Sequence, residues 1–118
     1  MKEYFKGEEK INNSTYKKDG LFTEFWNNGY MRWQGTFKNG KLNGSYNEWY
    51  EDGQKMIEVT YQNGKEDGLV TSWYSNGQKK DMQIYKNDKL VKSLGKWNED
   101  GSERKETFLT ERENEISL

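Results

Sequence analysis

Short runs of alternating apolar and polar residues fill most of the chain. Within residues 20–43, two such runs cover residues 21–26 and 31–37. Asn28-Gly29 separates the two runs, and Asn39-Gly40 follows the second. Alternation with a period of two predicts half-buried β-strands, and Asn-Gly predicts a tight hairpin turn, because both residue types tolerate the positive φ that this turn requires. Residues 20–43 are therefore expected to form two antiparallel strands and two turns.

This unit returns with a period of 24 residues. Its copies are GLFTEFWNNGYMRWQGTFKNGKLN, GSYNEWYEDGQKMIEVTYQNGKED and GLVTSWYSNGQKKDMQIYKNDKLV, at residues 20–43, 44–67 and 68–91. Residues 1–19 form a degenerate leading hairpin in this scheme, and residues 92–118 hold a degenerate fourth copy and a C-terminal cap. Such repetition is typical of one supersecondary unit that is stacked until its neighbours bury its apolar face. We therefore expect one all-β domain, a single-layer antiparallel β-meander of about four to five two-stranded repeats in a twisted, coiled open sheet.

Tight turns at both positions would also fix the pairing of the strands. The numbers of opposed residues would sum to 57 across Asn28-Gly29 and to 79 across Asn39-Gly40, so each repeat would step two residues along the strands. One face then carries Phe22, Glu24, Trp26, Met31, Trp33, Gly35, Phe37, Tyr46, Glu48, Tyr50, Ile57, Val59 and Tyr61. The other face carries Leu21, Thr23, Phe25, Arg32, Gln34, Thr36, Ser45, Asn47, Trp49, Met56, Glu58 and Thr60.

The C-terminal tail lacks the strand pattern of the repeats. Thr110 to Glu113 has the spacing of a helix capping box. We expect a short capping helix up to Leu118 that lays Ile116 and Leu118 over the last strand.

The composition argues against enzymatic chemistry. The chain contains no His and no Cys, so neither a His-assisted serine nor a cysteine nucleophile is available. Glu24 and Glu48 occupy equivalent positions on one face, as the acid and base of a glycosidase would. Ser72 and Lys96 stand at the next two equivalent positions, which is typical of solvated charges on a strand. We therefore expect no catalytic activity.

The distribution of charged residues argues against some classes of ligand. The 19 basic and 20 acidic residues are mixed along the chain, without the basic stripe that is typical of nucleic-acid binders. Acidic turns such as Asp52-Gly53 suit turn geometry and lack the ligand spacing that calcium needs. The N-terminus has no apolar segment of the signal-peptide kind. We expect a cytoplasmic protein with no metal or other cofactor and no nucleic-acid partner.

Aromatic residues are the candidates for function. They recur as the doublets Phe25-Trp26, Trp49-Tyr50 and Trp73-Tyr74, with Trp97 alone in the fourth copy. Adjacent strand residues point to opposite faces, so each face receives a row of aromatics. Two interpretations stay open, cross-strand packing that stabilises the sheet and binding of a partner. The candidate partner-binding residues are Phe25, Trp49, Trp73 and Trp97, with the charged Arg32, Glu58 and Lys80.

The repeat has a consensus of its own, G-x-x-x-x-W-Y-x-x-G followed by N-G-K-x-x-G, over residues 20 to 101. In the second unit it rests on Trp49-Tyr50, Gly53, Tyr61, Asn63-Gly64-Lys65 and Gly68, and in the third on Trp73-Tyr74, Gly77 and Tyr85. This pattern resembles the MORN repeat in its bacterial variant form. The fourth unit departs from it at Lys92, Asn98 and Arg112, which replace a glycine, an aromatic residue and a glycine.

The resemblance implies a single-layer antiparallel sheet that acts as a scaffold and not as a catalyst. The bacterial variant is similar to antitoxins and immunity proteins, which bind and block a toxin, whereas the eukaryotic branch is associated with membranes and scaffolding. We therefore expect a non-enzymatic protein-binding module, the immunity protein or antitoxin of a bacterial toxin encoded nearby. The alternative is a carbohydrate- or lipid-binding scaffold that uses the exposed aromatic row. A membrane partner is not expected, because the chain shows no basic face.

Overall fold

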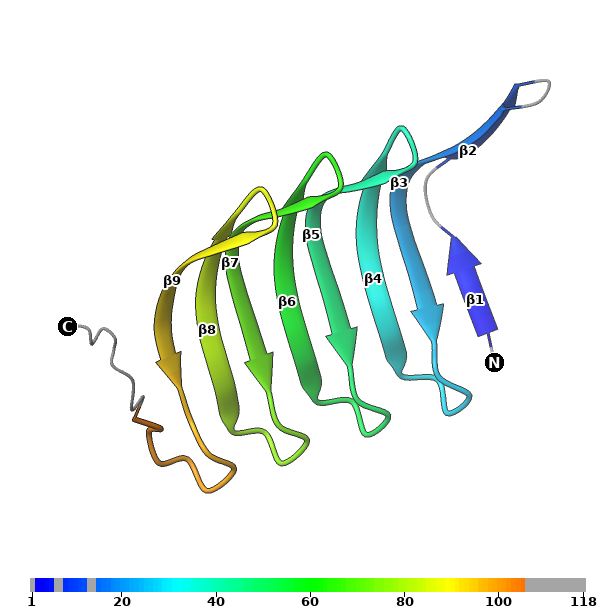
Figure 1. Cartoon of the computed structure of the whole chain (residues 1–118). Coiled ribbons are helices and arrows are strands. Elements are labelled where there is room, and N and C mark those ends of the chain that lie inside the picture. Colours follow the sequence, from blue (N-terminus) through cyan, green and yellow to red (C-terminus); the bar gives the residue numbers. More distant parts are fainter. Residues whose placement is uncertain (1, 6–7, 13–14, 106–118) are drawn as a thin grey trace.

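The sheet is a single open layer. The structure, a computed structural model, describes residues 2–5, 8–12 and 15–105. These residues form the strands β1 (Lys2–Phe5), β2 (Glu8–Asn12), β3 (Thr15–Phe25), β4 (Met31–Lys38), β5 (Lys41–Trp49), β6 (Lys55–Gln62), β7 (Lys65–Trp73), β8 (Lys79–Lys86) and β9 (Lys89–Lys96). From β3 onward each strand pairs antiparallel with the next, while β1 and β2 both pair with β3 (Figure 1). The all-β, single-layer meander predicted from the sequence is confirmed. The helix expected near the C-terminus falls outside the described residues.

One of the two turns in each repeat is the tight hairpin turn that the sequence predicts. Asn39 and Gly40, between β4 and β5, have φ values of 52° and 81°. Asn63-Gly64 and Asn87-Asp88 have the same left-handed conformation at the following two turns of this kind. Asn and Asp tolerate this region better than other residues with a Cβ, because their short polar side chains can form local hydrogen bonds.

The other turn is longer than predicted. Between β3 and β4 only Gly29 has a positive φ, of 96°, whereas Asn28 does not. The backbone N–H of Trp26 donates to the carbonyl of Tyr30 at 2.7 Å, which closes a loop of three residues. The Oδ1 of Asn28 accepts a hydrogen bond from the Tyr30 N–H at 2.9 Å. Positive φ at Asn28 was therefore a wrong prediction, because this residue forms an Asx turn in place of a second left-handed residue.

The repeats stack in register, and the expected two-residue step is wrong. Between β4 and β5, Phe37 pairs with Leu42 as predicted, but the register then shifts so that Gly35 pairs with Tyr46. The residues inserted on β5 include Gly44, which has a φ of 114°. The tight turn alone would offset successive repeats by two residues along the strands. The residues inserted on β5 cancel this offset, so each residue lies in line with the one 24 positions later. One such row contains Glu24, Trp33, Glu48, Ile57, Ser72, Asp81 and Lys96.

A second register shift, near the three-residue turns, changes the face of the sheet to which some side chains point. Glu48 pairs with Ile57 and Trp49 with Lys55, so Met56 falls between pairs. The equivalent residues of β4 and β8 are Arg32 and Lys80. A bulge of this kind redirects side chains and breaks the strict alternation of the strand. The expectation from parity that Arg32 and Met56 share the face of Glu58 is therefore wrong.

The buried hydrophobic side chains form a strip across one face of the sheet. Phe22 is fully buried, and Val59 and Val70 are nearly so. The ring of Phe37 meets that of Phe22 edge-on, with centroids 5.4 Å apart. Gly35 leaves room for the neighbouring side chains, because a Cβ at this position would lie 3.0 Å from a ring carbon of Tyr46. The core of this fold is thus one face of a sheet and not the space between two layers.

Candidate protein-binding groove

An open groove of about 700 Å³ lies on this face and extends from β5 to β8. Its apolar lining consists of Leu42, Met56, Ile57, Val59 and Val70, and its aromatic lining of Tyr46, Tyr50, Tyr61, Trp73 and Tyr85. Its polar lining consists of Glu48, Glu66, Ser72, Lys80, Asp81 and Gln83. Every lining residue except Leu42 comes from the second and third repeats, so the stacking of two units builds most of the groove.

The floor of the groove is apolar and closely packed. Val59 and Val70 are paired across β6 and β7 and are 4% and 7% exposed. Tyr46 pairs with Val59 from the other side, and its ring lies 6.1 Å from that of Tyr61. The Tyr46 ring also stacks on Trp33 of the preceding repeat at 6.0 Å. Tyrosine rings held in this way offer a large amphipathic contact area at little further entropic cost.

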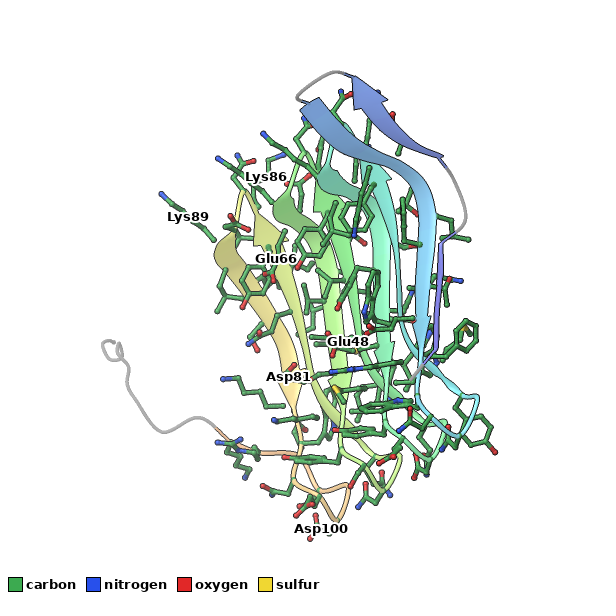
Figure 2. The ribbon with its side chains drawn as sticks, turned by 90° about the vertical axis from the view of Figure 1, so that its right-hand side faces the viewer. Glu48, Glu66, Asp81, Lys86, Lys89 and Asp100 are labelled. Carbon is green, nitrogen blue, oxygen red and sulfur yellow. The ribbon has the colours of Figure 1, made fainter. Side chains whose placement is uncertain are left out.

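Carboxylates stand at both ends of this floor. Glu48 and Asp81 belong to one row across the sheet, while Glu66 pairs with Tyr61 nearer the tight turns. Figure 2 shows Glu66 toward the end of the sheet that carries Lys86, and Asp81 toward the opposite end. Hydroxyl groups orient two of these carboxylates, because Tyr46 donates to Glu48 and Ser72 donates to Asp81 at 2.8 Å.

Burial shifts the protonation equilibria of the groove. It raises the pKa of Tyr46 far above the ordinary value of 10.0, and the hydrogen bond to Glu48 adds to this effect. Burial also raises the pKa of Tyr61, with smaller contributions from nearby carboxylates. The pKa of the Glu66 carboxyl is raised by burial and then by the negative charge of Asp88. Both tyrosines therefore stay neutral hydrogen-bond donors over the whole physiological pH range.

Side chains also tie each three-residue turn to the next one. The Tyr50 hydroxyl donates to the carbonyl of Trp73, and the Tyr74 hydroxyl donates to the carbonyl of Trp97. The Nε1 of Trp26 makes the equivalent bond to the Trp49 carbonyl at 3.2 Å. The second aromatic residue of each doublet therefore has a structural role between repeats.

The residues predicted to bind a partner do not form one surface. Trp73 and Lys80 line the groove. Trp49 and Arg32 line a smaller hollow of about 240 Å³ beside it, which Glu48 also borders. The bulges account for the position of Arg32 and Lys80, since both residues fall between cross-strand pairs.

The remaining predicted residues lie apart from the groove lining. Glu58 is exposed and forms an ion pair with Lys55 at 2.7 Å. Trp97 pairs with Glu103 in an isolated bridge beyond the end of β9, and Phe25 is half-buried at the end of β3. The tyrosines and carboxylates of the groove were not among the predicted site residues, although strand parity had placed Tyr46, Glu48 and Tyr61 on one face.

The part of the chain that the structure describes contains no helix with the length and apolar character needed to cross a bilayer. Within the same ranges, no group of three or more acidic side chains is arranged to hold a metal ion.

Comparison with known families singles out the repeats that build the groove. Residues 42–63 and 66–87 each match the MORN repeat variant. The first segment contains most of β5 and all of β6, and the second contains most of β7 and all of β8. No curated protein and no solved structure matches the chain significantly. Repeats of this family are non-catalytic binding modules for membranes, lipids or proteins.

Proposed function

We propose that the protein is a non-catalytic module that binds another protein in its groove, since its second and third repeats match the MORN repeat variant. The observation that carries this proposal is the composition of the groove, in which tyrosine rings and carboxylates surround an apolar floor. Interfaces between proteins have this anatomy, with an apolar and aromatic centre and a polar rim.

The tryptophans favour a protein partner over a sugar. A sugar-binding platform needs open faces on its aromatic rings, but the Lys55 ammonium lies 5.3 Å from the centroid of the Trp49 ring. The Lys79 ammonium lies 5.7 Å from the Trp97 ring in the same way. These contacts resemble cation–π interactions that stabilise the sheet itself. We therefore assign Trp49 and Trp97 mainly to the structure of the repeats.

The specific role that we propose is that of a cytoplasmic immunity protein or antitoxin, which neutralises a bacterial toxin by occupying part of its surface. A small module without catalytic groups suits this role, because inhibition by binding needs only a stable complementary surface. The carboxylates of the groove would set the orientation and the association rate of the partner, and the tyrosines would supply contact area.

Co-expression with the product of the neighbouring open reading frame tests this role. We expect a complex that co-elutes on size exclusion and restores growth of the host. The groove variant Tyr85→Ala should weaken both effects, whereas Thr60→Ala, an exposed position of β6, should not. Absence of both a complex and a rescue would remove the toxin from the proposal.

A further inference from the structure

The groove is more negative than the chain as a whole. Its described lining holds the carboxylates Glu48, Glu66 and Asp81 against one ammonium group, that of Lys80. The net charge of the whole chain is only −1. The excess negative charge therefore lies in the groove, around its apolar floor. This is the part of the surface best suited to contact a partner.

The carboxylates are spaced for an elongated ligand. Glu48 and Asp81 belong to the same row and are three strands apart, which corresponds to about 14 Å at the usual strand spacing. Ser72 of that row pairs with Ile57 of β6 and Glu66 pairs with Tyr61, four residues further along β6, which corresponds to roughly 13 Å along the strand. The nearly buried Val59 and Val70 lie between these two positions. A ligand that meets all three carboxylates must cross this apolar strip.

Two of the three carboxylates are oriented by hydroxyl donors and retain acceptor capacity. The Tyr46 hydroxyl holds Glu48 and the Ser72 hydroxyl holds Asp81. An ionised carboxylate accepts up to about four hydrogen bonds, so one hydroxyl donor does not saturate it. Charge-assisted hydrogen bonds from a guanidinium or ammonium group would be stronger here than at an open surface, because the groove is partly desolvated.

We propose that the groove binds a basic segment of a partner protein, with its Arg or Lys head groups against Glu48, Asp81 and Glu66. The aliphatic stems of these side chains pack on the apolar floor and on the tyrosine rings, as long basic side chains do on mixed surfaces. This inference rests on the proposed protein-binding function and adds the chemistry of the partner to it.

Selection of a random 12-residue peptide library displayed on phage, with the full chain as the target, tests the proposal. We expect the bound peptides to be enriched in Arg and Lys. Synthetic copies of the selected peptides should bind the double variant Glu48→Gln and Asp81→Asn at least tenfold more weakly than they bind the parent protein. Their affinity for the parent protein should fall as the sodium chloride concentration is raised. Both replacements keep an oxygen that can accept the native hydroxyl bond, so the sheet should remain intact, which circular dichroism and a thermal melt will show.

The matched control is the double variant Glu51→Gln and Glu99→Gln, which removes the same charge from exposed positions outside the groove. It should leave the affinity unchanged. Selection of neutral or acidic peptides that compete for the groove would overturn the basic partner and leave the protein-binding function standing. If none of the selected peptides needs Tyr85 for binding, the result would count against both the basic partner and the protein-binding function.

Discussion

The Tyr50 hydroxyl donates a 2.8 Å hydrogen bond to the backbone carbonyl of Trp73, 23 residues further along the chain. Tyr74 and Trp97 repeat this bond at 2.9 Å in the next unit. The bond joins the three-residue turn of one repeat to the equivalent turn of the next, where the strand pairing has just ended. The second aromatic residue of each doublet thus helps to hold neighbouring repeats together.

Loss of this hydroxyl should destabilise the sheet. Tyr50→Phe leaves a half-buried carbonyl without its donor and should lower the free energy of unfolding by about 1 kcal/mol, as for a typical intramolecular hydrogen bond. Urea denaturation followed by tryptophan fluorescence measures the change. Tyr30→Phe is the matched control, because the Tyr30 side chain is 53% exposed. Equal losses in the two variants would show that the bond to Trp73 contributes nothing.

Two glycines should resist substitution for different physical reasons. A Cβ at Gly35 would lie 2.9 Å from Leu42 Cδ2 and 3.0 Å from Tyr46 Cδ1. Overpacking of this kind typically costs about 1 to 3 kcal/mol, so Gly35→Ala should destabilise the protein. Gly29 has open space around it but a φ of 96°, so Gly29→Ala suffers only backbone strain.

A second substitution separates these two causes. Leu42→Ala opens space beside Gly35, so the double variant Leu42→Ala and Gly35→Ala should be more stable than the sum of the single losses implies. No such coupling is expected between Leu42→Ala and Gly29→Ala. Thermal or urea unfolding of the single and double variants gives the coupling energies. If the losses in free energy of unfolding from Leu42→Ala and Gly35→Ala simply add, the expected clash between a Cβ at Gly35 and Leu42 is contradicted.

The sequence predicted the fold because its strongest signals are local. Asn39-Gly40 and its equivalents fix tight turns, and alternation fixes strands, whatever the rest of the chain does. The register across several strands depends on two bulges, and nothing in the alternation marks them in advance. Gly44 was visible as a repeated glycine, but its role as the inserted left-handed residue of β5 becomes evident only when the pairing is known.

The fourth repeat shows how much this glycine matters. Lys92 stands at the position of Gly44 and Gly68, and here the register shift is divided into two smaller steps, beside Gln83 and beside Tyr85. The candidate site was predicted less well than the fold for a related reason. The bulge at Lys80 and its equivalents moves side chains between faces, so a set of residues chosen by parity does not stay together.

The repeats differ in one hydrogen bond that a substitution should restore. Asn28 donates from Nδ2 to the Glu51 carbonyl at 2.7 Å, and Asn76 donates to the Glu99 carbonyl at 2.8 Å. Asp52 stands at the equivalent position in the second repeat, where its side chain only accepts the Gln54 N–H. Asp52→Asn keeps that acceptor and adds a donor toward the third repeat.

We expect Asp52→Asn to raise the free energy of unfolding by about 0.5 kcal/mol, at the low end for a hydrogen bond because the site is exposed. Urea denaturation at neutral pH measures this gain. The reverse change, Asn28→Asp, should lower stability by a similar amount, since it removes the same bond from the first repeat. A gain from Asp52→Asn that disappears in sodium chloride concentrated enough to screen surface charge would point to an effect of charge and contradict the bond between turns.

The last prediction concerns Glu66, whose pKa is raised above the ordinary value of 4.5 by burial and by Asp88. A raised pKa in the folded state means that folding favours the protonated carboxyl. This contribution is fully present below pH 4.5 and is lost as the pH rises through the raised pKa. Glu66→Gln should therefore gain stability relative to the parent protein between pH 4 and pH 7, as measured by urea denaturation at both values. Asp88→Asn, which keeps an acceptor for the Glu66 N–H, should bring the pKa of Glu66 closer to 4.5 in an NMR titration. An unchanged difference between Glu66→Gln and the parent at the two pH values would contradict the raised pKa.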